Sequence, residues 1–132
     1  MVASLRHHSA LPSEPPVLDT RVFQELLETL AGDLDIVVSI YRTFLVTAVT
    51  LIGNLPDQGC AGQAATLHTL KGSASMIGAA RVARLAAHLQ RVAAKSVHPV
   101  IKTRSEELTG ELNILRTAIN AHVRSLQNRP GI

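Results

Sequence analysis

Large apolar residues recur at helical spacing along most of the chain, and this pattern limits the choice of fold more than any other feature. No useful length of sequence alternates apolar and polar residues with a period of two, so no strand is predicted. Phe23, Tyr41 and Phe44 are the only Phe, Tyr or Trp side chains among the 132 residues. Aliphatic side chains must therefore form the core, and short ones favour closely packed helices. A chain of this length fits one all-α domain.

The periodic segments are separated by residues that commonly begin or end helices, such as Asp19, Gly32 and Pro56. The second helix is expected to begin at Asp33 or Asp35. The expected helices cover about 19–32, 33–54, 60–77, 80–96 and 101–127, with a turn over 57–62. Short links between long amphipathic helices make neighbours antiparallel, so the predicted architecture is an up-down helical bundle.

Three prolines mark the N-terminal segment as a tail or linker. Pro12, Pro15 and Pro16 disfavour helix, and little apolar periodicity precedes them. The expected division is a flexible tail over 1–17 and one bundle domain over 18–128. No convincing signal peptide pattern is found in this segment.

The stretch from Ile36 to Leu55 is apolar and long enough to raise the question of a membrane span. Arg42 lies inside it, and its large residues recur on one side of a helix. Such a one-sided stripe is typical of a helix that buries one face in a bundle, so no membrane contact is predicted.

Charge and metal-binding residue types argue against several other functions. The formal net charge is +3, but the basic residues are scattered from Arg6 to Arg129 without stacking aromatics, so nucleic-acid binding is not expected.

Cys60 is the only cysteine, which excludes an intrachain disulfide and a cysteine-rich zinc site. We interpret it as a small helix residue. The adjacent His7 and His8 lack further ligands for an ordered site, so no metal is predicted.

The most informative segment is the run from Leu67 to Ala74 on the expected third helix. At about 100° per residue, Leu67, Leu70, Ala74 and Ile77 fall on one face, which we expect to be buried. His68 points the other way. The residues that share its outer face are Ala61, Ala64, Ala65, Lys71, Gly72 and Ser75.

An imidazole among small residues, with a cation one turn away, suits a nucleophile that another protein approaches closely. An exposed imidazole can attack through one nitrogen, and Lys71 can stabilise phosphoryl oxygens. Gly72 costs about 1 kcal/mol relative to alanine inside a helix, which indicates a need for room. The competing interpretation is an ordinary surface histidine, with Gly72 serving the packing of helices.

The run from His68 to Ser73, with Gly78 closing the same helix, resembles the signature of histidine-containing phosphotransfer (HPt) domains, His-x-Leu-Lys-Gly-Ser/Ala. The resemblance covers roughly residues 19–127. It implies an antiparallel up-down four-helix bundle with an additional short N-terminal helix. It also implies histidine phosphotransfer in a two-component phosphorelay, from the aspartate of one receiver domain to that of another.

The resemblance assigns roles to the matching positions. His68 matches the phosphoacceptor, Lys71 the lysine that helps to neutralise the phosphoryl group, and Gly72 the glycine that leaves room for the receiver. Gln90 resembles the Gln or Glu that hydrogen-bonds the imidazole; the competing interpretation is a solvated helix residue. The remaining residues expected to take part in docking are Ala64, Ala65 and Ser75.

The resemblance also implies what the partners supply. Receiver domains are expected to bring Mg²⁺ and their own acidic cluster, so no cofactor is expected in this chain. It contains no Gly-rich phosphate loop or kinase nucleotide motif, so autokinase activity is not expected. The expected setting is a cytoplasmic monomer. The Pro-containing tail suggests the C-terminal domain of a hybrid sensor kinase, with a free-standing protein as the alternative.

Two departures from the family pattern bear on partner preference. The segment 58–62 lacks the acidic residues that many relatives carry there, and His88 stands where many have a small residue or cysteine.

Two other functions stay open. One is a dimeric histidine-kinase core, disfavoured because no acidic residue follows His68. The other is a non-catalytic helical interaction module, in which His68 has no chemical role.

Overall fold

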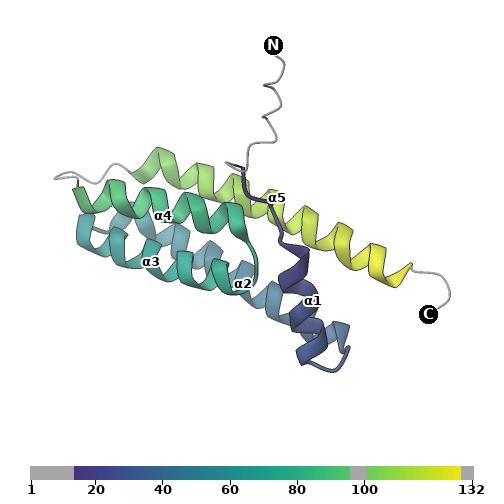
Figure 1. Cartoon of the computed structure of the whole chain (residues 1–132). Helices are drawn as coiled ribbons and strands as arrows, with labels where there is room; N and C mark the ends of the chain where they lie inside the picture. Colours follow the sequence, from purple (N-terminus) through teal and green to yellow (C-terminus); the bar gives the residue numbers. More distant parts are fainter. Residues whose placement is uncertain (1–13, 96–100, 129–132) are drawn as a thin grey trace, which may run out of the picture.

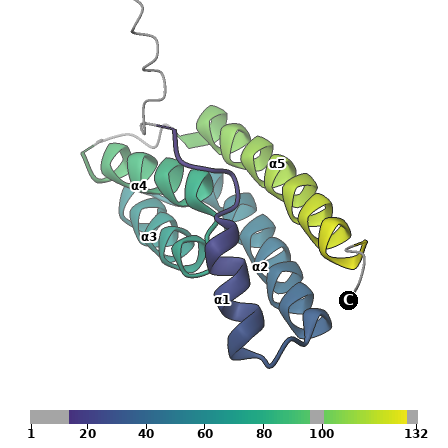
Figure 2. The same cartoon turned by 45° about the vertical axis from the view of Figure 1, so that its right-hand side comes forward.

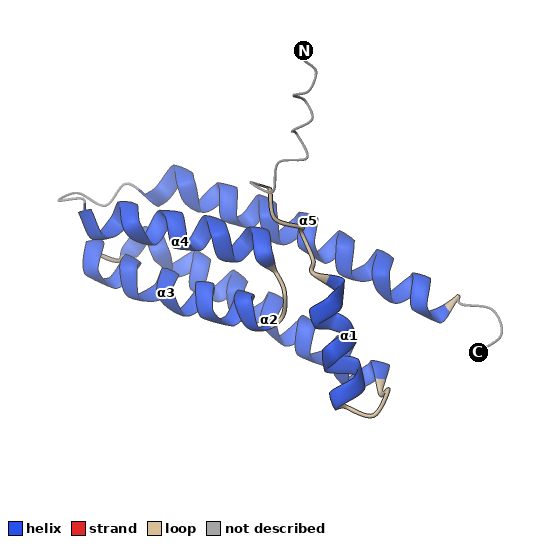
Figure 3. Cartoon of the chain, viewed as in Figure 1, coloured by secondary structure: helices blue, strands red, loops and turns tan. Residues whose placement is uncertain are grey.

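Every element in the described part of the chain is helical. The computed structural model describes residues 14–95 and 101–128, and Figures 1 and 3 show helices joined by short links. Its elements are α1 (Thr20–Thr29), α2 (Leu34–Asn54), the short 3-10 helix η1 (Leu55–Asp57), α3 (Cys60–Met76), α4 (Ala80–Lys95) and α5 (Ile101–Gln127). The five predicted helices are confirmed, and their ends differ from the predicted ones by a few residues at most.

Aspartates begin the first two helices. The carboxylate of Asp19 accepts a hydrogen bond from the backbone N–H of Arg21 at 3.0 Å, and Asp33 accepts one from Ile36 at 3.2 Å. These bonds satisfy backbone donors that a helix leaves free in its first turn. Asp33 is therefore the N-cap of α2, and Asp35 lies inside its first turn.

The end of α1 differs in detail from the predicted glycine cap. The N–H of Gly32 bonds to the carbonyl of Leu27 at 2.8 Å, and that of Ala31 bonds to Glu28 at 3.1 Å. This pair of bonds is a Schellman motif, in which the residue after the C-cap is left-handed. That residue is Ala31, with a φ of 57°, and Gly32 follows with a φ of 79°. Two successive left-handed residues turn the chain into α2.

The four longer helices form the bundle. Each of α2, α3 and α4 packs against the next helix in the chain, and α5 closes the ring against α2 (Figures 1 and 2). At 21 and 27 residues, α2 and α5 are the longest, and they extend past α3 and α4 at one end. The short helix α1 lies beside this extension. The antiparallel up-down four-helix bundle with an additional short N-terminal helix is therefore confirmed.

Aliphatic side chains fill most of the core, and the few aromatics attach α1 to it. Tyr41 is fully buried, and its hydroxyl donates a hydrogen bond to the carbonyl oxygen of Ile77 at 2.7 Å. Burial raises the pKa of the Tyr41 phenol above its usual value, which keeps the donor protonated. The ring of Phe23 stacks on Tyr41 with centroids 5.1 Å apart and meets the ring of His122 edge-on at 4.7 Å. Phe23 thus joins α1 to both α2 and α5.

Gly78, in the link between α3 and α4, lies in close contact with the start of α1. Its φ is 78°, in the left-handed region that glycine favours. A Cβ at this position would lie 2.9 Å from the Cβ of Val22 and 3.0 Å from the carbonyl oxygen of Asp19. The N–H of Asp19 bonds to the carbonyl of Gly78 at 2.8 Å. Only glycine fits this close approach between the two segments.

The apolar character of α2 follows from its packing. Together with η1 it forms a described stretch, Leu34–Asp57, that is long and apolar enough to cross a membrane, with a hydropathy of 1.9. Its predicted stripe faces the protein interior, and α2 packs against α1, α3 and α5. The buried residues of α2 are Val37, Tyr41, Phe44, Leu45, Ala48 and Ile52. The interpretation as a bundle helix with one buried face therefore fits the structure.

Part of the predicted N-terminal tail lies within the described residues. Residues 14–17 form no helix, but Val17 already packs against the core beside buried Leu18. The rest of the tail, with His7 and His8, lies outside the described residues.

Candidate functional site

The helix α3 buries one face and exposes the other, as its sequence predicts. Leu67, Leu70 and Ala74 are fully buried, whereas His68 is exposed. Because core side chains fill a closely packed space, the buried leucines fix the rotation of α3 about its axis. His68 is therefore held toward solvent by its own neighbours in the sequence.

The next helix places Gln90 beside His68. The amide Nε2 of Gln90 lies 3.5 Å from Nδ1 of the imidazole, the outer limit for a hydrogen bond and longer than the usual range of about 2.7–3.2 Å. The close approach of α3 and α4 depends on small side chains, since Ala86 and Ala93 of α4 are buried and Ala83 is half-buried. Gln90 itself is half-buried and touches the imidazole, so it is more than a solvated helix residue.

This contact distinguishes the two nitrogens of His68. Nε2 has no hydrogen bond to any residue that the structure describes, whereas Nδ1 faces the Gln90 amide. A neutral imidazole carries a proton on one nitrogen and a free lone pair on the other. An amide offers both an N–H donor and a carbonyl acceptor, and a half-turn of its plane exchanges them. When the amide oxygen accepts the proton of Nδ1, the lone pair lies on Nε2, as a nucleophile requires.

Small residues surround His68 on the outer face of α3. Ala65, Gly72 and Ser75 are exposed, and Ala64 is half-buried. A Cβ built on Gly72 would meet nothing within 4 Å. The packing of helices therefore does not need a glycine here, which contradicts the competing interpretation of Gly72. The glycine leaves an open surface one turn from His68.

Lys71 supplies a positive charge on the same side of α3. It is exposed and lies about 60° around the helix from His68. Lys71 forms no ion pair with the described residues, so its ammonium group can meet an anion that a partner brings. A cation one helical turn from an imidazole can stabilise negative charge that develops beside it.

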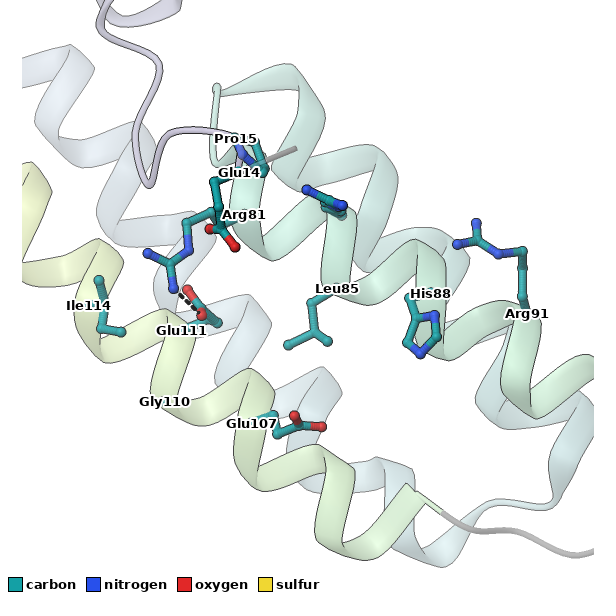
Figure 4. A pocket seen from close by; sticks show the side chains of 11 residues that line it. Glu14, Pro15, Arg81, Leu85, His88, Arg91, Glu107, Gly110, Glu111 and Ile114 are labelled. Atoms are coloured by element: carbon teal, nitrogen blue, oxygen red, sulfur yellow. Dashed lines mark hydrogen bonds and ion pairs between the residues drawn. The ribbon is translucent and has the colours of Figure 1, made fainter. Parts of the chain in front are cut away.

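A separate groove of about 560 Å³ lies between α4 and α5 (Figure 4). Arg81 and His88 of α4 line it. Arg81 forms an ion pair with Glu111 of α5, with 2.6 Å between the guanidinium Nη2 and the carboxylate Oε2. None of the predicted site residues lines this groove. His88 is exposed, lines the groove and lies about 160° around α4 from Gln90, so it points away from the imidazole of His68.

Other candidate chemistry is sparse in the described ranges. Within them, no group of three or more His, Cys, Asp or Glu residues could hold a metal ion. Cys60 is a half-buried free thiol at the first residue of α3, as its interpretation as a small helix residue expects.

Two features of this surface were not predicted from the sequence. Met76, at the end of α3, is 79% exposed and lies about 80° around the helix from His68. The basic residues are scattered along the sequence, but α4 gathers several of them on one face. Arg84 and Arg91 lie seven residues apart, and this spacing is the sequence signal that would have revealed their shared face.

Comparison with known families agrees with this geometry. The Hpt domain family matches residues 21–127, which include nearly all of the helical bundle. The chain belongs to the Hpt domain family. Hpt domains carry out histidine phosphotransfer in phosphorelays and interact with receiver domains. No curated protein and no solved structure matches the chain.

Proposed function

We propose that this Hpt domain accepts a phosphoryl group on His68 from the aspartate of one receiver domain and passes it to the aspartate of another. The observation that carries the proposal is the exposed imidazole of His68, with Gln90 lying 3.5 Å from its Nδ1. With the amide turned so that its oxygen faces Nδ1, this contact supports Nε2 as the attacking atom. The open surface at Gly72 supports close approach of the receiver.

The proposed forward step is an in-line displacement. The lone pair on Nε2 of His68 attacks the phosphorus of the aspartyl phosphate, a P–N bond forms, and the P–O bond to the carboxylate breaks. The receiver aspartate leaves as a carboxylate. The proton on Nδ1 stays within reach of the Gln90 amide, and Lys71 offers its ammonium group to the phosphoryl oxygens. In the return step a second receiver carboxylate attacks the phosphorus, and the P–N bond breaks.

The proposal gives the remaining chemistry to the partners. The receiver domains supply Mg²⁺ and the acidic residues that hold it, and this chain acts without a cofactor of its own. It does not phosphorylate itself with ATP. We also propose a cytoplasmic monomer, acting either as a domain of a hybrid sensor kinase or as a free-standing protein. The chain offers one proposed phosphoacceptor, His68, on a closed helical bundle. This arrangement supports a monomer that only relays a phosphoryl group between its partners.

Label transfer from a receiver domain that carries radioactive phosphate on its aspartate tests the proposal. His68→Gln removes the nucleophile, and His88→Gln is the matched control because His88 is also exposed on a helix. We expect the wild type and the control to take up a label that is labile in acid and stable in base. His68→Gln should remain unlabelled. Labelling of His68→Gln, or no labelling of the wild type by several receivers, would favour a non-catalytic interaction module.

A further inference from the structure

The helix α4 carries basic residues on one face and contains no acidic residue. At about 100° per residue, its basic side chains fall within a sector of about 80°. These residues are Arg81, Arg84, His88, Arg91 and Lys95. We call this surface the cationic face of α4.

Most of the charge on the cationic face is not neutralised within the described residues. Arg81 pairs with Glu111 of α5, and the other groove carboxylate of α5, Glu107, pairs with Arg104 (Figure 4 shows the first pair). By contrast, Arg84, Arg91 and Lys95 are exposed and form no ion pair with any described residue. The one other carboxylate that lines the groove is that of Glu14. Several cations therefore remain available to a partner.

The cationic face lies between the groove with α5 and the part of α4 that contacts His68. Gln90 contacts the imidazole, and Arg91 is the next residue along α4, about 100° around the helix. The core side of α4 is occupied by Val82 and Leu89, so Arg91 lies on the outer side, where it also lines the groove between α4 and α5. Arg84 lies about 10 Å away along the same side, given the rise of an α-helix.

A receiver that reaches His68 must also cover this outer side of α4. A standard interface takes about 800 Å² from each partner, which corresponds to a patch roughly 30 Å across. Packed helices lie only about 8–10 Å apart. A partner centred on the contact between His68 and Gln90 therefore extends over α4, far enough to reach Arg84 and Arg91.

We infer that Arg84 and Arg91, assisted by Lys95, select receiver domains whose surface next to the phosphorylated aspartate is acidic. This inference rests on the proposed function and names the kind of receiver that the site accepts. Complementary charge increases the rate of encounter and fixes the orientation of docking more than it changes the chemical step. The cationic face thus adds electrostatic selection to the steric fit around Gly72.

The test uses the full chain and an isolated receiver domain that carries carboxylates next to its aspartate. One variant is Arg84→Gln combined with Arg91→Gln. The control is Arg116→Gln combined with Arg124→Gln, which removes two exposed charges from α5, a helix not adjacent to α3. Phosphotransfer is measured against receiver concentration and salt, and binding of the beryllofluoride-treated receiver is measured separately. In a second receiver, the surface carboxylates near the aspartate are replaced by glutamine, and the acidic residues that hold Mg²⁺ are kept.

At low salt, kcat/KM of the α4 variant should fall by about three- to tenfold, with a weaker salt dependence and unchanged kcat. The control should match the wild type, and the neutral receiver should abolish the difference between wild type and variant. Equal kcat/KM for wild type and variant at all salt concentrations would overturn the inference and leave the relay intact. Salt-dependent binding that the variant weakens, without any phosphotransfer by the wild type, would support this docking surface and overturn the relay.

Discussion

The side-chain amide of Gln90 lies 3.5 Å from Nδ1 of His68 and links α4 to the outer face of α3. A residue that holds one ring nitrogen orients the other toward an incoming group. We therefore propose Gln90 as a positioning residue that acts through the tautomer and rotamer of His68. The contact is the only hydrogen bond that the structure describes for this imidazole.

Gln90→Leu should slow phosphotransfer about fivefold, because a hydrogen bond contributes about 1 kcal/mol and this energy is no longer used to orient the ring. Gln90→Glu keeps an acceptor for the Nδ1 proton and should retain most of the rate. The measurement is kcat at saturating phosphorylated receiver, together with the histidine tautomer from nitrogen NMR. Equal kcat for Gln90→Leu and the wild type would show that the contact has no positioning role.

Gly72→Ala should separate stability from function. Its position is helical and a Cβ would meet nothing within 4 Å, so alanine should stabilise the fold by about 0.5–1 kcal/mol. The same methyl group should slow transfer if a receiver approaches this surface closely. Gly110→Ala is the control, because Gly110 is also helical with an open Cβ position but lies on α5. Denaturant unfolding and label transfer check the two effects, and unimpaired transfer by Gly72→Ala would contradict close approach there.

Gly78→Ala should destabilise the fold by at least about 2 kcal/mol. Left-handed backbone costs about 1–2 kcal/mol for an L-residue, and the new Cβ would also press against Val22 and the Asp19 carbonyl. The consequence should be loss of the contact between α1 and the link after α3. Denaturant unfolding measures the change, with Gly72→Ala as the helical comparison. A stability equal to that of the wild type would mean that α1 can detach from this link at little cost.

The capping carboxylate of Asp19 should make stability depend on acidity. A side-chain hydrogen bond from Arg21 lowers the pKa of Asp19, so the folded state favours the carboxylate. The unfolded value is about 3.9, and the contribution is present above it and is lost as the pH falls through the lower folded value. Asp19→Asn keeps a capping side chain but removes the charge. The gap in melting temperature between wild type and variant should shrink below about pH 4. A gap that widens in acid would contradict this assignment.

Much of the fold could be predicted because a helix that packs on one side repeats its apolar residues whatever its partners are. The spacing of Leu67 and Leu70 also placed His68 outward without knowledge of the neighbouring helices. The contact of Gln90 with His68 could not be derived in this way, because it depends on the rotation of two helices and the distance between them. Only the family resemblance indicated it.

Local backbone geometry and surface charge were harder to predict. The sequence favoured Gly32 as the left-handed cap of α1, but Ala31 already takes that conformation because the Schellman bonds require it at the residue after the C-cap. The second role of Gly78 depends on a contact with Asp19, which is distant in the sequence. The spacing of the basic residues in the sequence indicates the cationic face of α4. The sequence does not indicate that Arg81 is paired, because this depends on the position of Glu111 on α5.

The central claim is that His68 accepts the phosphoryl group through Nε2. Phosphorus and nitrogen NMR of the chain, labelled at histidine and treated with a phosphorylated receiver, tests this most directly. We predict one phosphohistidine signal, assigned to Nε2 of His68 and absent from His68→Gln. A phosphoryl group on Nδ1, on another histidine such as His88, or on no histidine at all would contradict the claim.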